Sequence, residues 1–380
     1  MHLNSKLPAV GTTIFTIMSQ LASQYKAINL SQGFPDYGCS PQLVELVNHY
    51  MRSGYNQYAP MAGVYSLRER LSAKQEKLHQ AKYDPDTEIT ITAGGTQALF
   101  TSIACVIRPG DEVIIFEPAY DSYAPSVTLF GGKVRPVELS APEYLINWEE
   151  VRGLISDRTR MIIINTPNNP TARTLGEEDM AELIRITKNT NILILGDEVY
   201  EHLVYDGKKH LSISHYPELK ERSFITASFG KLLHTTGWKV GYCLAPEWLM
   251  KEFRKVHQYE VFSVNSAVQY AISDFLLNEC NYLEISNFFQ TKKDFFHNLM
   301  KETRFDLLPC YGSYFQSAQY SRISDEGDTD LTVRIIKEFG VASIPVSAFY
   351  SKGTDHKVLR FCFAKKQETL EKAVIRLAKI

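Results

Sequence analysis

The chain has 380 residues, of which 44% are hydrophobic and 22% are charged. This composition is typical of a folded protein with a sizeable core, and it excludes a disordered chain. The formal net charge is only -2, and acidic and basic residues are interspersed. We therefore expect no strong field that would attract nucleic acid or an anionic membrane, and the composition favours small-molecule chemistry.

The six cysteines are widely separated and lack the spacing of zinc-binding motifs, so we predict reduced thiols and no metal site. The N-terminal sequence has no long apolar segment followed by a small-residue cleavage site, as a signal peptide would have. No apolar run approaches the ~20 residues of a membrane span. These features together predict a cytoplasmic protein without a membrane contact.

From about residue 88, short β-branched runs alternate with longer amphipathic stretches. The β-branched runs are TEITITAG, DEVIIFEP, GKVRPVEL, RMIIINTP and NILILGDEVY. The amphipathic stretches among them are GTQALFTSIACVI and GEEDMAELIRITKN. This alternation indicates βα units and a parallel sheet. Segments such as ILIL, and MIIIN before its final asparagine, are apolar at every position, which is expected when helices cover both faces of the sheet.

After about residue 247 the pattern changes to long helices followed by a new set of strands. The helical stretches are EWLMKEFRKVHQY, SAVQYAISDFLLNE and residues 288–302; the strand stretches are GSYFQSAQY, GVASIPVSAFY and KVLRFCFA. We predict an α/β fold with a large domain at residues 46–275, whose mostly parallel sheet is covered by helices. A smaller α+β domain is expected at residues 276–380, with residues 1–45 packed on it.

Polar residues follow four of the predicted strands, at Asn165, Asp197, Ser228 and the glycine turn 94–96. Ligands of open α/β sheets bind beyond the carboxyl ends of the strands, so these residues are expected to meet. Each important residue also has a simple structural interpretation. Taken alone, Lys231 is better explained as a solvated lysine and Asn169 as a turn residue. Asp197 could equally be a helix N-cap, and Arg360 could equally be half of an ion pair.

Taken together, these residues supply what pyridoxal 5'-phosphate requires. The cofactor needs an amine for its aldehyde, a carboxylate for its ring nitrogen, donors for its 3-oxygen, an anion site for its phosphate and a ring to stack on. Lys231 is the candidate amine, and Asp197 is the candidate carboxylate. Asn169 and Tyr200 are candidate donors to the 3-oxygen, and Tyr120 is the candidate ring for stacking. The candidate phosphate site consists of Gly95, Thr96, Ser228 and Lys239. Partly desolvated surroundings would lower the pKa of the Lys231 amine toward its reactive neutral form.

Further motifs extend this agreement over nearly the whole chain. They are NLSQGFPD from Asn29, NTPNNPT from Asn165, DEVYEH from Asp197, SFGKLLHTTGWKVGY from Ser228, and the LRFCFAKK run that ends at Lys366. In order and spacing the sequence resembles the fold type I, class I/II aminotransferases, which depend on pyridoxal phosphate. Within that family, NQYAPMAGVYSLRE and HQYEVFSVN resemble the branch of methionine aminotransferases and kynurenine aminotransferases (glutamine transaminase K).

The resemblance implies further roles. Lys231 would be the catalytic lysine that bonds to the cofactor, and Arg360 would bind the substrate α-carboxylate, assisted by Asn169 and the backbone at Gly33. Phe15 and Tyr37 would line the side-chain pocket. Tyr58, Phe262 and Ser263 would act from a partner subunit, Tyr58 on the phosphate, which implies a homodimer.

The sequence departs from parts of the family. Thr96 stands where some eukaryotic relatives carry a tyrosine, and no second arginine for a dicarboxylic side chain is evident among the pocket positions. The prediction is transamination between an amino acid and a 2-oxo acid by a ping-pong mechanism. Methionine is the first choice of donor, followed by aromatic amino acids, histidine, glutamine and kynurenine.

Three alternatives remain open at this point. The same site could catalyse β-elimination from cysteine S-conjugates, or the chain could be a cofactor-binding regulator without turnover. A nicotinamide-dependent dehydrogenase is disfavoured, because no G-x-G-x-x-G motif follows the first strand of the predicted sheet.

Overall fold

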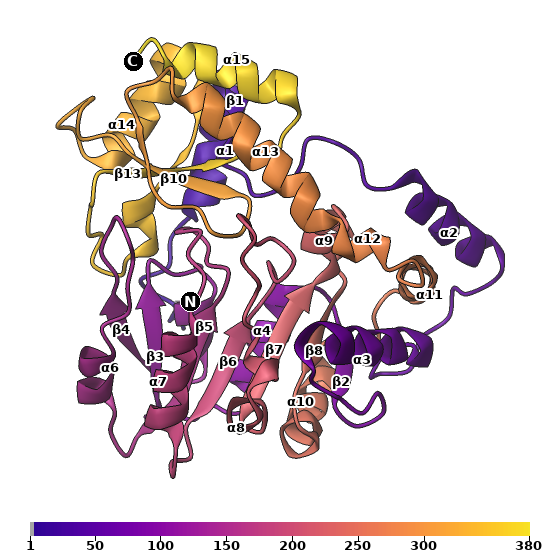
Figure 1. Ribbon diagram of the computed structural model, residues 1–380. Helices are drawn as coiled ribbons and strands as arrows, with labels where there is room; N and C mark the ends of the chain where they lie inside the picture. Colours follow the sequence, from indigo (N-terminus) through magenta and orange to yellow (C-terminus); the bar gives the residue numbers. More distant parts are fainter. Residues whose placement is uncertain (1–3) are drawn as a thin grey trace.

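The computed structural model describes residues 4–380, and the first three residues of the predicted N-terminal segment lie outside the described residues. Figure 1 shows two sheet-centred units, a large one in the lower half of the view and a smaller one above it. The N-terminal helix α1 (Ile14–Gln24) and the C-terminal helix α15 (Gln367–Leu377) both belong to the upper unit. The first and the last helix of the chain therefore contribute to the same unit.

The large unit is built on a seven-stranded sheet. Its strands are β2 (Ile89–Thr92), β3 (Glu112–Glu117), β4 (Lys133–Glu138), β5 (Thr159–Asn165), β6 (Leu193–Asp197), β7 (Ser223–Ser228) and β8 (Gly241–Leu244). The strand order is β2-β8-β7-β6-β5-β3-β4, and β8 is antiparallel to both of its neighbours, whereas the other pairs are parallel. The prediction of a mostly parallel sheet in an α/β fold is confirmed.

Helices cover this sheet on both faces. They are α3 (Tyr65–His79), α4 (Gly95–Ala104), α5 (Tyr123–Leu129), α6 (Trp148–Leu154), α7 (Glu177–Thr187), α8 (Pro217–Lys220), α9 (Phe229–Leu232), α10 (Glu247–Glu260) and α11 (Ser266–Phe275). Side chains of one strand alternate between two buried clusters: Ile162 belongs to one and Ile163 to the other. Because both faces are buried, the middle positions of strands such as β3 and β5 are consecutively apolar, as the sequence pattern indicates.

The smaller unit contains the four-stranded antiparallel sheet β12-β13-β10-β9. Its strands are β9 (Asp306–Leu307), β10 (Phe315–Gln319), β12 (Ile344–Pro345) and β13 (Val358–Cys362), and its helices include α12 (Cys280–Leu283), α13 (Ile285–Met300) and α14 (Asp328–Arg334). Strand β1 (Ile28–Asn29) pairs in parallel with β11 (Val341–Ala342), which joins the N-terminal segment to this unit. Helix α2 (Pro41–Arg52) packs against α11 instead. The division of the chain at residues 45 and 275 stays a prediction.

Within residues 4–380, no helix combines the length and the apolar character needed to cross a lipid bilayer.

A buried ion pair ties α3 to the loop that follows β6. The Lys74 ammonium lies 2.5 Å from a Glu201 carboxylate oxygen and 2.9 Å from the Tyr242 hydroxyl, and the two charged side chains are only 2% and 6% exposed. We expect Lys74→Ala to lower the free energy of unfolding by about 3 kcal/mol, because it leaves a buried carboxylate without its cation. Denaturant unfolding of the cofactor-free protein measures this loss.

Lys77→Ala on the same helix is the matched control. Lys77 also pairs with a glutamate, Glu279, but about half of each side chain is exposed. Exposed pairs contribute little, so a change below about 1 kcal/mol is expected. Equal losses in the two variants would contradict the assignment of the Lys74 pair as a buried stabilising contact.

Candidate active site

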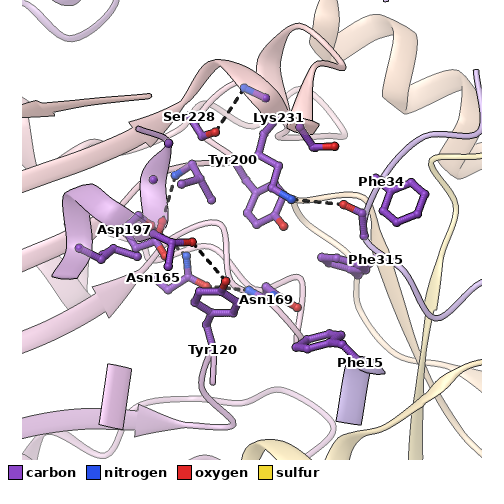
Figure 2. A pocket seen from close by; sticks show the side chains of 18 of the residues that line it. Phe15, Phe34, Tyr120, Asn165, Asn169, Asp197, Tyr200, Ser228, Lys231 and Phe315 are labelled. Carbon is purple, nitrogen blue, oxygen red and sulfur yellow. Dashed lines mark hydrogen bonds between the residues drawn. The ribbon is translucent and has the colours of Figure 1, made fainter. Parts of the chain in front are cut away.

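The polar residues at the strand ends line one cavity of about 320 Å³, which lies beyond the carboxyl ends of the parallel strands. Residues from the smaller unit and from the N-terminal segment form its other walls. The lining includes the predicted site residues Phe15, Gly33, Gly95, Thr96, Tyr120, Asn169, Asp197, Tyr200, Ser228, Lys231, Lys239 and Arg360. Figure 2 shows Lys231 reaching into the site between Asp197 and Asn165 on one side and Phe34 and Phe315 on the other.

The register of the sheet explains why these residues meet. Asn165 at the end of β5 is the direct partner of Asp197 at the end of β6. The Asn165 side chain donates to the Asp197 carbonyl at 2.9 Å and accepts from the Asn169 amide at 2.8 Å. The last residue of β5 therefore fixes the loop that presents Asn169 to the cavity.

Asp197 is a buried carboxylate held by two donors. The Tyr123 hydroxyl donates to one carboxylate oxygen at 2.5 Å, and the Val199 amide donates to the other at 3.3 Å. Burial raises the pKa of Asp197 to about 6, while these two hydrogen bonds and the charge of Lys231 act in the opposite direction. At neutral pH the group is therefore mainly ionised and can pair with a cationic ring nitrogen.

The Tyr123 hydroxyl is expected to have a measurable effect on the pKa of Asp197. Removing its hydroxyl in Tyr123→Phe deletes a hydrogen bond that favours the carboxylate, so the pKa of Asp197 should rise further above 6. We expect the acid-side loss of pyridoxal phosphate affinity to begin about one pH unit higher than in the wild type. Fluorescence titration with pyridoxal phosphate across the pH range measures this shift.

The control for this experiment is Tyr144→Phe, because Tyr144 is also a buried tyrosine but its hydroxyl has no hydrogen-bond partner within the described residues. That variant should keep the wild-type pH profile. An unshifted profile in Tyr123→Phe would show that its hydroxyl does not tune Asp197.

Lys231 lies on α9, directly after β7, and its amine points into the cavity. The amine donates to the Tyr314 hydroxyl at 2.9 Å and to the Gly33 carbonyl at 3.2 Å. Burial lowers the pKa of Lys231 to about 8, with Arg360 and Lys239 acting in the same direction. A substantial fraction of the amine is therefore neutral near physiological pH, as a nucleophile or base requires.

The N-terminus of α4 has the features of the predicted anion site. Its N-cap Gly94 has φ +86°, and a Cβ there would lie 3.4 Å from the Lys239 amine. Gly95 begins the helix, so its N–H points out of the first turn toward the cavity. The Ser228 hydroxyl and the Lys239 amine line the same corner, and together they can hold a phosphate.

Arg360 on β13 is fully buried at the opposite wall. Its guanidinium donates to the Asn169 side-chain oxygen at 2.7 Å and to the Ser31 carbonyl at 2.6 Å, and its plane lies over the Phe315 ring at 3.9 Å. Burial lowers the pKa of Arg360 to about 10, which still leaves it charged at neutral pH. Within residues 4–380 no carboxylate lies within ion-pair distance of it, and its Nε has no hydrogen-bond partner.

Four predicted residues do not line this cavity: Tyr37, Tyr58, Phe262 and Ser263. The Tyr37 ring packs edge to face on His234 and Phe288. Tyr58 is 81% exposed and contacts the ring of Phe262 at a centroid distance of 5.1 Å, beside a separate surface hollow. The roles predicted for Tyr58 and Phe262 in a partner's site stay predictions, as does that of Ser263 nearby.

Sequence reasoning missed two residues of the site, Tyr123 as the donor to Asp197 and Tyr314 as the partner of Lys231. It placed Asn165 at the site but missed its role as a support for the loop. Tyr123 is part of the EPAYDSY stretch that also contains Tyr120, so its closeness to the site could have been inferred. Tyr314 is 83 residues from Lys231, and no local pattern connects them.

The family Aminotransferase class I and II matches residues 25–377. The chain belongs to the class I and II aminotransferases. It is 46% identical to methionine aminotransferase from Escherichia coli strain K12, over 99% of this chain and 98% of that protein. A solved structure from Escherichia coli, described as identifying a methionine aminotransferase function, superimposes with a TM-score of 0.98 at 46% identity and covers both chains completely.

This aminotransferase is also 32% identical to human kynurenine–oxoglutarate transaminase 1, with 93% of this chain and 92% of the human protein covered. The resemblance to the branch that contains both kinds of enzyme is therefore confirmed. The chain is accordingly an enzyme that transfers amino groups, and the interpretations as a regulator without turnover or as a dehydrogenase are set aside.

Proposed function

We propose that this aminotransferase uses pyridoxal 5'-phosphate bonded to Lys231 and transfers the amino group of methionine to a 2-oxo acid. Other predicted donors are aromatic amino acids, histidine, glutamine and kynurenine. The observation that carries the proposal is the placement of three groups around one cavity: the Lys231 amine, the Asp197 carboxylate and the Arg360 guanidinium without an acidic partner.

The residues fit the cofactor. Asp197 is buried at the end of β6, where it can pair with a ring nitrogen, and Gly95, Ser228 and Lys239 can hold a phosphate at the other end. Tyr120 lines the wall between them and can stack on a ring. When bound, pyridoxal phosphate withdraws electrons from the substrate Cα and carries the amino group between the two substrates.

Three side chains of the protein bind the substrate, move its proton and stabilise the charge of the cofactor ring. Arg360 binds the substrate carboxylate through charge-assisted hydrogen bonds, and Asn169, which accepts from it at 2.7 Å, holds it in place. Lys231 Nζ, whose pKa is lowered to about 8, takes the proton from the substrate Cα. Asp197 keeps a positive charge on the ring nitrogen by remaining ionised.

The cavity also supports the choice of donor. Phe15, Phe34 and Phe315 form an aromatic wall on which a thioether or an aromatic side chain can pack. Arg360 is the one arginine among the cavity-lining residues of the described chain, so an acidic side chain would find no arginine partner there. The Escherichia coli relative, which is a methionine aminotransferase, supports methionine as the first donor to test.

A homodimer and a cytoplasmic location complete the proposal. The hollow lined by Met51, Tyr55 and Tyr58 carries large exposed aromatic side chains, which is typical of a protein–protein contact. We propose that a second copy of the chain covers it and receives Tyr58 and Phe262 into its site. All six cysteines are free thiols, as is common in the reducing cytoplasm.

An absorbance spectrum tests the proposal. The purified protein incubated with pyridoxal phosphate should show the near-visible band of a lysine-bound cofactor, and methionine alone should convert it to a band at shorter wavelength. Adding a 2-oxo acid should restore the first band. A band that does not change when methionine is added would mean that another amino acid is the donor. The lack of any band would overturn the assignment of Lys231.

The same samples separate transamination from β-elimination. Elimination from a cysteine S-conjugate would release pyruvate and ammonia without an added 2-oxo acid. When a cysteine S-conjugate replaces methionine in these samples, we expect no such release in the absence of a 2-oxo acid.

A further inference from the structure

Three segments that are far apart in the sequence meet at the hydroxyl of Tyr314. Tyr314 directly precedes β10, Lys231 lies on α9 and Gly33 follows β1. The hydroxyl donates to the Gly33 carbonyl at 2.5 Å and accepts from the Lys231 amine at 2.9 Å, and the amine also donates to the Gly33 carbonyl at 3.2 Å. The three polar groups thus form a closed triangle of hydrogen bonds.

We propose that Tyr314 is a positioning residue for the reaction: its hydroxyl holds the amine of Lys231 against the Gly33 carbonyl whenever that amine is not bonded to the cofactor. The inference rests on the proposed role of Lys231. A lysine that has released the cofactor has four rotatable bonds and would otherwise sample many orientations. Proton transfer requires one orientation, so a fixed amine transfers the proton faster.

The side chain of Tyr314 is held rigidly by the residues around it. Tyr314 is only 1% exposed, and its ring is packed against the rings of Tyr200, Phe315 and Phe289 at centroid distances of 5.2, 4.9 and 5.7 Å. Gly33 is equally constrained, because a Cβ at this position would lie 2.7 Å from the Phe315 ring. The two acceptors of the amine are therefore rigid.

Other groups act on the amine without setting its direction. Burial disfavours the protonated amine, as do the charges of Arg360 and Lys239, whereas the charge of Asp197 favours it. Within residues 4–380, however, the hydrogen bonds of the amine go to Tyr314 and Gly33. Tyr314 does not itself accept a proton from substrate, because burial raises the pKa of its hydroxyl well above 10 and keeps it protonated. Its role is therefore to position Lys231.

Tyr314→Phe removes only the hydroxyl oxygen, and Tyr320→Phe is the matched control. Tyr320 is also fully buried, follows β10 and donates to a backbone carbonyl, that of Glu326 at 3.0 Å. The first measurement is the single-turnover rate with methionine, and with methionine deuterated at Cα, without a 2-oxo acid. We expect Tyr314→Phe to be about 10- to 100-fold slower with a larger isotope effect, and the methionine concentration at half-maximal rate to change less than about threefold.

The second measurement needs no cofactor. The rate of Lys231 acetylation in the cofactor-free protein is followed against pH by peptide mass spectrometry, with Lys231→Ala as the blank. Because the tyrosine oxygen accepts a hydrogen bond from the charged amine, its removal should move the midpoint downward by about half a pH unit to one unit. Tyr320→Phe should match the wild type in both measurements.

The outcomes separate the inference from the proposed function. If Lys231→Ala retains cofactor-dependent turnover, the proposed role of Lys231 fails and the inference fails with it. If Lys231→Ala is inactive but Tyr314→Phe keeps the wild-type rate and midpoint, only the inference is overturned. A slower rate without a change in isotope effect or midpoint would indicate a merely structural tyrosine and would also overturn it.

If Tyr314→Phe fails to fold, a crystal structure of the cofactor-free wild type tests the inference instead, because it shows where the Lys231 amine lies. An amine within hydrogen-bond distance of Tyr314 supports the inference, and an amine elsewhere overturns it.

Discussion

Replacing Lys231 with alanine is expected to lower the turnover of methionine by about 10⁴- to 10⁶-fold, with the cofactor supplied in excess. The loss is large because one amine is assigned two tasks, the covalent attachment of pyridoxal phosphate and the transfer of the substrate Cα proton. The structure supports both, since the amine faces the cavity and burial lowers its pKa to about 8. Turnover at saturating methionine and the absorbance of the protein with pyridoxal phosphate measure the two tasks separately.

Small amines provide a sharp control for this variant. Methylamine or ethylamine in the assay buffer can occupy the space of the missing side chain, and they should restore part of the proton transfer to Lys231→Ala. They should not accelerate the wild type. If Lys231→Ala retained more than about a tenth of wild-type turnover, the lysine could not be the group that moves the proton.

Arg360→Ala should mainly weaken binding of the α-carboxylate. Losing two charge-assisted hydrogen bonds to a carboxylate is expected to raise KM for methionine by about 10²- to 10³-fold, with a smaller fall in kcat. The basis is the buried guanidinium on β13, which has hydrogen bonds to Asn169 and Ser31 but no acidic partner within the described chain. Steady-state kinetics with methionine and a fixed 2-oxo acid measure both constants.

A substrate without the carboxylate separates binding from misfolding. Because Arg360 packs on Phe315 at 3.9 Å, its removal also leaves a cavity that can destabilise the protein. The amine 3-(methylthio)propylamine is methionine without its carboxylate, and its slow reaction should be equal in the wild type and in Arg360→Ala. A parallel fall with both substrates would mean that the variant has lost its fold, and an unchanged KM for methionine would contradict the assignment.

Much of the fold could be predicted because its pattern is local. Strands β5 and β6 contain runs of consecutive apolar residues, and this pattern requires cover on both faces, which the two buried clusters around Ile162 and Ile163 provide. The polar residues that end these strands could be placed at one edge for the same reason, since parallel strands direct their carboxyl ends to the same side. The residue numbers that divide the two units could not be fixed in this way, because no change of composition marks them.

The sequence alone determined which chemical groups are available and roughly where: an amine after β7, a carboxylate after β6, a glycine turn before α4 and an arginine within β13. Only the tertiary structure decided which groups touch. Tyr123 reaches Asp197 across 74 residues, Tyr314 reaches Lys231 across 83, and Arg360 reaches Asn169 across 191. The physical reason is that hydrogen bonds form over about 3 Å between rigid elements, and such distances depend on sheet register and on packing between the two units rather than on any local pattern of residues.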